Sequence, residues 1–323
     1  MRQDAANTRG GASCRFCGMA AALTLTTEEQ NVSHQTVRLL VLFVAMSLSA
    51  TLLAQTPCST LTVAGTWAAS STGTIFVSVP GSQTVMSVPG AALGLVSIGY
   101  DGRFSAALTS PGNNVMDQTM KGTLTVNSDC SGTVNATSSL GFKWIEQFVI
   151  LDEGNEIWTF STGGMGVNPI VWQCRWRKIS PAPSDMLKGA MNCSANMITG
   201  TWVGSYNGFI LMSGQPSPVP AGITFIGGIS YQGNLTGKFT NSVGGAVGSG
   251  QYVGSIIEVK PDCTGTWKWT LKGTSGAGIS GQGIEKFVIL NGGNEMWTAG
   301  LQGPIGAPVG IGRYRRISPV PSN

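Results

Sequence analysis

The chain has one histidine, His34, and it lies in an N-terminal segment that we expect to be removed. Without histidine, the rest of the chain cannot use a Ser-His-Asp or Cys-His catalytic arrangement and lacks the usual zinc ligand. It also has no glycine-rich loop that ends in the Lys-Ser/Thr pair of a phosphate-binding loop. The sequence therefore predicts a protein that is not an enzyme and needs no metal or cofactor.

Charged residues are scarce, at 11% of the chain, and the formal net charge of +4 is spread along it. No basic run with interleaved aromatic residues is present, so we expect no nucleic-acid partner. Glycine is frequent, with 46 residues, and Thr, Ser, Val and Ile are prominent. This composition is typical of an all-β protein with many turns, rather than of a helical or a disordered chain.

Only residues 39–54 form a long apolar run, with Arg38 before it and Ala54 at its end. A basic residue, an apolar segment and a small residue are the parts of a secretory signal peptide. Because a membrane span needs about 20 apolar residues, we expect 1–54 to be a cleaved leader and the exported protein to keep no stable membrane span. An uncleaved segment would instead anchor the chain. Residues before Val37 are expected to be disordered, or absent if translation starts there.

The rest of the chain repeats itself. Residues 145–159 and 284–298 agree at eleven of fifteen positions, and each reads as a strand, a tight Gly-Asn turn and a return strand. Apolar and polar residues alternate around the other turns, which indicates antiparallel strands with one covered face. We therefore expect an all-β protein of two tandem antiparallel β-barrel-like domains, 55–184 and 193–323, joined by a linker at 185–192. A β-sandwich is the alternative.

Five cysteines follow the leader, and four of them match between the two copies. Cys58 and Cys130 are 72 residues apart, and Cys193 and Cys263 are 70 apart. In an exported protein, matched pairs of this kind predict the disulfides Cys58–Cys130 and Cys193–Cys263. Cys174 has no cysteine counterpart. We expect a buried free thiol there, with an intermolecular disulfide or a redox role as alternatives.

Each copy has a Gly-x-Trp near its start and arginines on its last strand. This combination resembles the lipocalin and wider calycin β-barrels, in which a tryptophan closes one end of the barrel beneath an arginine. The resemblance covers only the two ends of each copy, since the mid-chain Thr-Asp-Tyr motif and the helix after the last strand are absent. It implies a calycin-like barrel with a ligand cavity in each copy. The implied closing pairs are Trp67 with Arg177 or Arg175, and Trp202 with Arg315 or Arg313.

Two pairs of an acid and a tryptophan fall in the repeated stretch, Glu156 with Trp158 and Glu295 with Trp297. Strand alternation puts both members of each pair on one face. If that face points inward, each barrel holds a carboxylate beside an indole, which suits a polar or cationic ligand in an apolar cavity. If it points outward, the pairs are surface residues beside the arginine-rich last strand.

Other residues of the repeat have less specific interpretations. We expect the matched acids Glu146 and Glu285 at a solvated edge or in a salt bridge. Trp267 and Trp269 are candidates for stacking on a glycan if they are exposed. The four-residue apolar runs Phe148–Leu151 and Phe287–Leu290 do not alternate, which predicts strands covered on both faces and packing of the two copies through these runs.

The predicted function is an exported, non-catalytic protein that binds a small apolar or amphipathic ligand in its barrel cavities. The alternative is a structural or adhesive envelope protein, or one that contacts glycans, without a cavity. An interior void lined by Trp158 or Trp297 would favour the ligand, and a filled core would favour the structural protein.

Overall fold

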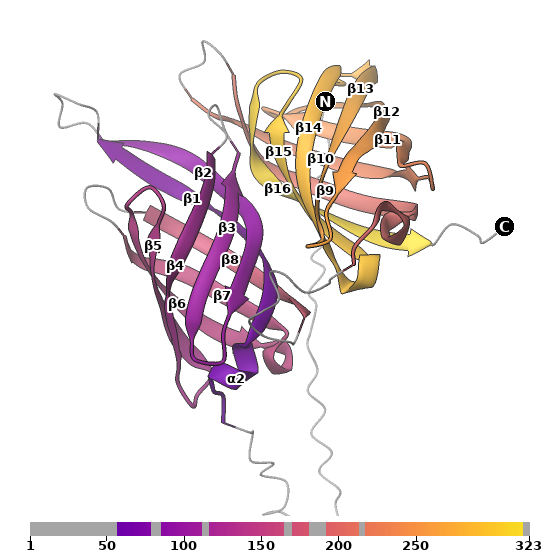
Figure 1. The fold of residues 1–323 in the computed structure, drawn as a ribbon. Coiled ribbons are helices and arrows are strands. Elements are labelled where there is room, and N and C mark those ends of the chain that lie inside the picture. Colours follow the sequence, from indigo (N-terminus) through magenta and orange to yellow (C-terminus); the bar gives the residue numbers. More distant parts are fainter. Residues whose placement is uncertain are drawn as a thin grey trace, which may run out of the picture. The chain divides into compact units, whose positions relative to one another are not determined.

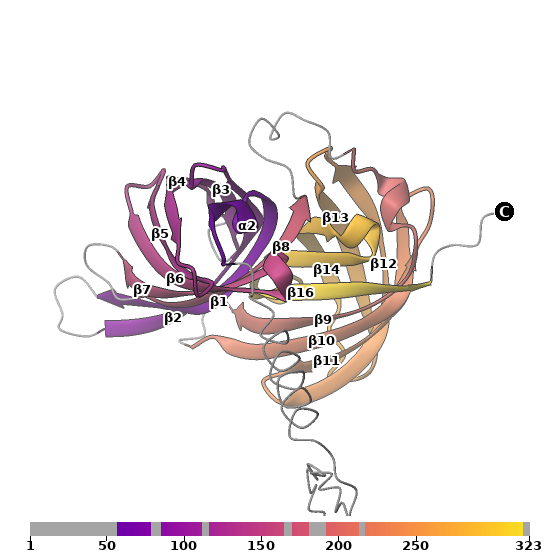
Figure 2. The same ribbon diagram turned by 90° about the horizontal axis from the view of Figure 1, so that it is seen from below.

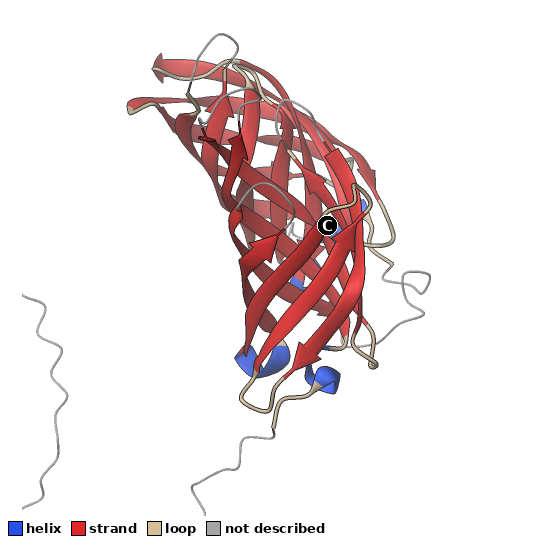
Figure 3. Cartoon of the chain, turned by 90° about the vertical axis from the view of Figure 1, so that its left-hand side faces the viewer, coloured by secondary structure: helices blue, strands red, loops and turns tan. Residues whose placement is uncertain are grey.

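The computed structural model describes residues 57–78, 85–111, 116–164, 170–180, 192–212 and 217–318. The predicted leader lies outside these residues, as does most of the predicted linker. Within the described ranges nearly every residue belongs to a strand, and helix is limited to single turns (Figure 3). None of the helices in these ranges is long and apolar enough to cross a membrane.

The first copy forms a closed antiparallel barrel (Figure 1). Each strand pairs with the next one in the sequence, and the last pairs with the first. Its strands are β1 (Gly65–Ser78), β2 (Val85–Ile98), β3 (Arg103–Ser110), β4 (Met116–Val126), β5 (Ser131–Ser138), β6 (Lys143–Leu151), β7 (Glu156–Gly164) and β8 (Ile170–Ser180).

The second copy forms a barrel of the same topology, in which β16 returns to β9 (Figure 2). Its strands are β9 (Gly200–Leu211), β10 (Val219–Ile229), β11 (Asn234–Val243), β12 (Ala246–Val259), β13 (Thr264–Gly276), β14 (Gly281–Leu290), β15 (Glu295–Gln302) and β16 (Ala307–Ser318). Closure of both sheets confirms the predicted tandem all-β barrels and removes the sandwich alternative.

A short helical turn precedes the first strand of each barrel and lies at its closing tryptophan. In the first barrel this turn is α2 (Thr60–Val63), and the indole Nε1 of Trp67 donates a hydrogen bond to the Val63 carbonyl at 2.9 Å. In the second it is η2 (Ala195–Ile198), and Trp202 donates in the same way to Ile198 at 2.8 Å. The Gly-x-Trp pattern therefore ties each first strand to the turn before it.

The disulfides secure the same turns. Both predicted bridges are present, Cys58–Cys130 and Cys193–Cys263, and each connects the segment before the helical turn to a distant hairpin. Closing loops of this length stabilises the folded state by about 4 kcal/mol in the chain-entropy model. Cys174 is a buried free thiol, as expected.

The Gly-Asn turn of the repeated stretch packs on these helical turns, through η1 (Asp152–Gly154) and η3 (Asn291–Gly293). Gly154 and Gly293 both have φ of +88°. A Cβ atom on Gly293 would lie 2.2 Å from the Met197 carbonyl oxygen, so only glycine fits there. The most similar segment of the two copies is thus explained by closure of the barrel end.

Candidate functional site

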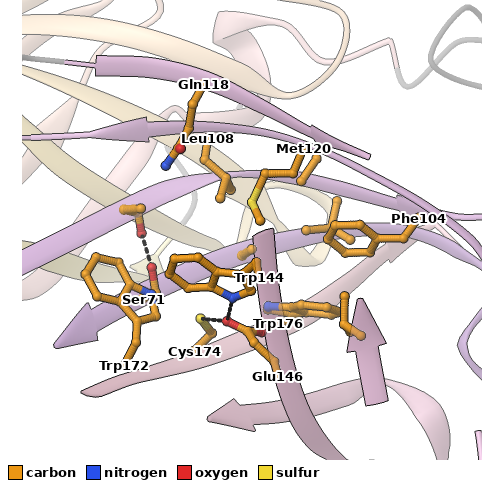
Figure 4. A pocket seen from close by; sticks show the side chains of 15 residues that line it. Ser71, Phe104, Leu108, Gln118, Met120, Trp144, Glu146, Trp172, Cys174 and Trp176 are labelled. Atoms are coloured by element: carbon orange, nitrogen blue, oxygen red, sulfur yellow. Dashed lines mark hydrogen bonds between the residues drawn. The ribbon is translucent and has the colours of Figure 1, made fainter. Parts of the chain in front are cut away.

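The first barrel has a carboxyl group in its interior. Burial alternates along β6, and Glu146 lies in the buried phase with only 3% of its side chain exposed. Its carboxyl group accepts a hydrogen bond from the Trp144 indole Nε1 at 2.5 Å, and the Cys174 thiol lies 3.5 Å away (Figure 4). It also accepts a hydrogen bond from the Thr159 hydroxyl at 2.6 Å. Burial raises the pKa of Glu146, although these hydrogen bonds act to lower it.

The prediction of a solvated edge or salt bridge for Glu146 and Glu285 is therefore wrong. Both acids are in phase with the buried apolar residues that follow them, Phe148 and Phe287. Residues two positions apart in a strand point to the same face, so the acids should lie on the inner face with these phenylalanines. That spacing was the sequence signal for an interior carboxyl group.

A cavity of about 40 Å³ lies beside the Glu146 carboxyl. Figure 4 shows the tryptophan rings, the thiol and the carboxyl gathered around it. The larger side chains at its wall are Leu108, Met120, Trp144, Trp172 and Trp176. A space of this size holds a few water molecules, whereas pockets for drug-sized ligands have volumes of roughly 300–1,000 Å³. As it stands, the first barrel has room only for a very small molecule.

The second barrel keeps the carboxyl but has still less space. Glu285 is 3% exposed and accepts a hydrogen bond from the Trp267 indole at 2.9 Å, and burial raises its pKa. The cavity is about 20 Å³, because aromatic rings fill the barrel. Tyr314 contacts both Phe225 and Trp267, with ring centroids 5.7 and 5.5 Å apart. Since Glu285 is buried in a filled barrel, an interior carboxyl by itself indicates no ligand.

The two interiors are filled from different strands. In the first barrel Trp144 of β6 faces Ala136 of β5, whereas in the second the indole is on the neighbouring strand, with Trp269 of β13 facing Gly283 of β14. A Cβ atom on Gly283 would lie 2.3 Å from the Trp269 ring. The large residue has thus changed places with the small one across a strand pair.

A second exchange accounts for the unmatched cysteine. Ser71 faces Cys174 in the first barrel, and Tyr206 faces Gly312 at the same position in the second. Cys174 therefore occupies interior volume beside Glu146, and burial raises the pKa of its thiol well above the usual value. Such a thiol is a weak nucleophile, which favours a packing role over a redox role.

The cation over each closing tryptophan is not the predicted one. Lys178 Nζ lies 4.9 Å from the centre of the Trp67 ring, and the Arg316 guanidinium lies 5.9 Å from that of Trp202. Lys178 directly faces Trp67 across the strand pair, so both share the inner face. The predicted partners were the arginines of the opposite, outer face: Arg175, Arg177, Arg313 and Arg315.

Glu156 and Trp158 lie on the outer face of β7 and line no barrel cavity. The Trp158 indole donates a hydrogen bond to Glu156, which also accepts from Arg175 at 2.6 and 3.0 Å and from Arg177 at 2.7 Å. Partial burial acts to raise the pKa of Glu156, but the hydrogen bonds from Arg175, Trp158 and Arg177 bring it down to about 2. The outward alternative therefore holds, and the pair is part of an ion-pair cluster.

The matching pair, Glu295 and Trp297, also lies on the outside of its barrel, but its surroundings differ. Glu295 accepts hydrogen bonds from the Trp297 indole at 2.9 Å and from Asn291 at 2.8 Å. Trp297 has no exposed surface, and the guanidinium groups of Arg313 and Arg175 lie 5.5 and 5.7 Å from its ring centre. This indole is therefore buried by packing on the outside of the second barrel.

The outer surface of β6, β7 and β8 carries a group of exposed apolar side chains. Their exposed fractions range from 40% for Leu151 to 65% for Val171. Val149 directly faces Trp158 across the strand pair, so these side chains adjoin one another. We call this surface the β6–β8 face, and its apolar members are Ile145, Val149, Leu151, Trp158, Phe160 and Val171. Contiguous exposed apolar surface of this kind marks sites of protein contact.

The equivalent surface of the second barrel is covered. Val288, Leu290, Trp297 and Ala299 are at most 1% exposed and form a cluster with residues of β1 and β2. The partners in that cluster are Ala68, Ala91, Leu93 and Leu95.

The expected packing of the two apolar runs on each other needs correction. Phe287–Leu290 is buried on both faces, but in Phe148–Leu151 the side chains of Val149 and Leu151 are 43% and 40% exposed. The run of the second copy packs on β1 and β2 of the first, and not on its counterpart.

The two tryptophans proposed for glycan stacking face the interior of the second barrel. Trp267 is 3% exposed, and Trp269 packs against the same core. Trp267 packs against the Phe287 ring, and Trp269 is half-buried and lies against Gly283. The glycan interpretation of this pair is therefore wrong.

Comparison with known proteins assigns this chain to no family. No family model matches the chain, and no curated protein matches it. Among solved structures, the chain is similar to a "putative AttH" from Nitrosomonas europaea, with 8% identity, a TM-score of 0.26, and coverage of 78% of this chain and 92% of that one. No functional argument rests on a similarity at that level, and the resemblance to lipocalins stays a prediction.

Proposed function

We propose that this protein is an exported, non-catalytic structural protein that acts through protein–protein contacts, with the β6–β8 face as its binding surface. One observation carries the proposal. The β6–β8 face is 40–65% exposed, although its identical counterparts Val288, Leu290 and Trp297 are buried against another protein surface. The same surface chemistry is therefore used as an interface once within this chain.

The composition of the β6–β8 face supports an interface. Trp158 and Phe160 lie at its centre, and the Glu156 cluster with Arg175 and Arg177 lies at its edge. Aromatic residues and arginine are enriched in protein interfaces, which have apolar centres and polar rims. Two disulfides indicate an oxidising environment, and with the signal-like segment they support export.

Site-specific photocrosslinking in cells that export the protein tests this function. A photoreactive phenylalanine analogue at Phe160 should give a discrete protein adduct, and the adduct should disappear in the Val149→Lys background. The same analogue at Val253, which is 56% exposed on β12 of the second barrel, is the matched control. Equal labelling from both positions, or no adduct from Phe160, would contradict the proposal.

A second candidate function is binding of a very small ligand in the first barrel. The observation in its favour is the 40 Å³ cavity beside the Glu146 carboxyl, which could offer one hydrogen bond to a polar group on an otherwise apolar molecule. Native mass spectrometry of protein from its own host would reveal such a molecule. Ala92→Ile, which copies Ile223 of the second barrel, should fill the space and abolish binding. An unliganded wild-type protein would count against this function.

A further inference from the structure

We infer that the partner of the β6–β8 face is a second copy of this chain, which binds through the outer surface of β9 and β10, so that copies join head to tail. The inference rests on the proposed function and names its partner. Its template is the contact between the two copies within one chain, where the outer surface of β14–β16 packs on that of β1 and β2. All these strands belong to one compact unit, Thr56–Asn323.

The first half of the template is reproduced on the β6–β8 face. Val149, Leu151 and Trp158 occupy the same positions in the repeat as Val288, Leu290 and Trp297, and the residues are identical. The three in the second copy are at most 1% exposed, and the three in the first are 40–45% exposed. Arg175 matches Arg313, whose guanidinium lies over the Trp297 ring, but Arg175 already contacts the same ring within the chain. The free face therefore has the residues that make the internal contact.

The second half of the template is reproduced in part on β9 and β10. The covering surface in the internal contact consists of Ala68, Ala91, Leu93 and Leu95, and strand register matches these positions to Val203, Gly222, Thr224 and Ile226, so two of the four remain large and apolar. Ile226 is 51% exposed. Phe209, further along β9, is 39% exposed but lines a groove with Thr72 and Gly73 of the first barrel, so it borders the internal contact. Within the described residues, the chain thus has one unused surface of each kind.

A polar contact at the edge of the template supports the match independently. In the internal contact Lys286 Nζ lies 2.6 Å from the Thr109 hydroxyl and 3.4 Å from the Asp117 carboxylate. On the two proposed surfaces, the residues at the corresponding positions are uncharged. Gln147 corresponds to Lys286, and Thr240 and Ser249 correspond to Thr109 and Asp117.

This coupled change keeps the two surfaces compatible. A lysine kept on one surface without an aspartate on the other would lose its ion pair, which is a small cost because Asp117 is 75% exposed in the internal contact. Gln147 can instead exchange hydrogen bonds with hydroxyl groups such as those of Thr240 and Ser249. Both members of the pair lose their charge together, as expected if the two surfaces meet.

A contact between two different surfaces does not close on itself. Each added chain uses one surface and leaves the other free, so the assembly grows into a ring if the rotation closes and into a filament if it does not. The contact between the two barrels of one chain would then be repeated between neighbouring chains. A symmetric dimer through two β6–β8 faces would instead stop at two chains.

Two blocking variants of the full-length exported protein test the inference by sedimentation velocity. Val149→Lys blocks one surface and Ile226→Lys blocks the other. Both residues are exposed, so the variants should fold, which circular dichroism checks. We expect the mass of the wild-type protein to rise with concentration. Each variant alone should associate at least about tenfold more weakly, as for a charge placed in the centre of an apolar contact.

The decisive measurement is the equimolar mixture. Each variant keeps the surface that the other has lost, so the mixture should form a one-to-one dimer and stop there. Val253→Lys, an equally exposed valine outside both surfaces, should assemble as the wild type does. A wild-type monomer at all concentrations, a mixture that stays monomeric, or association blocked by Val149→Lys but not by Ile226→Lys would overturn the inference. If Phe160 still crosslinks to a different protein in cells, the proposed function survives that failure.

Discussion

The buried carboxyl of Glu146 should make the stability of the first barrel fall as the pH rises. Burial raises the pKa of Glu146 in the folded state above its usual value of 4.5. The folded protein therefore holds a proton that the unfolded chain releases. Its contribution to stability is fully present below pH 4.5 and is lost as the pH rises through the folded-state pKa. Glu146→Gln removes this proton equilibrium but keeps the side-chain size and an oxygen that can accept the Trp144 hydrogen bond.

The size of the effect follows from proton linkage. One proton bound only in the folded state lowers the free energy of unfolding by about 1.4 kcal/mol per pH unit. The difference in unfolding free energy, variant minus wild type, should therefore increase by about that amount per unit above pH 4.5. It should become constant above the folded-state pKa, and the pH of that change measures the pKa. Glu285 is present in both proteins, so its own contribution cancels.

Urea unfolding with the disulfides intact, followed by tryptophan fluorescence across the acidic and neutral range, measures this difference. Glu153→Gln is the control, because it makes the same substitution at an exposed turn of the same barrel. A difference between Glu146→Gln and wild type that is independent of pH would show that Glu146 keeps the same pKa on folding. A difference that decreases with pH would show an ionised carboxylate in the barrel. Either result would refute the interpretation of Glu146 as a buried neutral acid.

Three further predictions concern packing and closure, and all are checked by the midpoint of urea unfolding. Trp144→Gly should destabilise the first barrel by about 3–5 kcal/mol, and adding Ala136→Trp, which copies the second barrel, should restore more than half of this loss. If the double variant is no more stable than the single one, the exchange of rings between strands is not compensatory. Gly293→Ala should cost about 2 kcal/mol or more, because its Cβ would meet a carbonyl at φ +88°, whereas Gly292→Ala, with φ +59° and open space, should cost less than about 1 kcal/mol. Equal losses would remove the steric argument. Lys178→Met removes the cation over the closing indole and should cost about 1–2 kcal/mol, while Lys178→Arg, the choice of the second barrel, should be tolerated.

Much of the fold could be predicted from the repeat. Matching two copies of one chain identified both disulfides and the tandem barrels, because features shared by both copies stand out from local variation. It was harder to assign which residues of a strand face the barrel interior. Lys178 was missed because Arg175 and Arg177, which precede it, fitted the resemblance better, and only the cross-strand partner of Trp67 settles which face a residue occupies.

The sequence marked both apolar runs as covered strands, but it could not show that only one of them is covered within the chain. Val149 and Val288 occupy the same position in the repeat, with the same neighbours, yet their exposed fractions are 43% and 1%. Local sequence is identical, so the difference comes entirely from what lies against each strand. The interior space was equally hidden, since the residues that fill it come from different strands in the two copies.

The exchange of Trp144 with Trp269 also bears on how the chain avoids misassembly. Two similar halves in one polypeptide can trade strands while they fold, and the hybrids would hydrogen-bond as well as the native barrels do. If β14 entered the first barrel in place of β6, Gly283 would face Ala136 and leave a void where an indole belongs. If β6 entered the second, Trp144 would collide with Trp269. A void and an overpacked core each cost a few kcal/mol, so the ring exchange discriminates between the copies and directs each strand back to its own half.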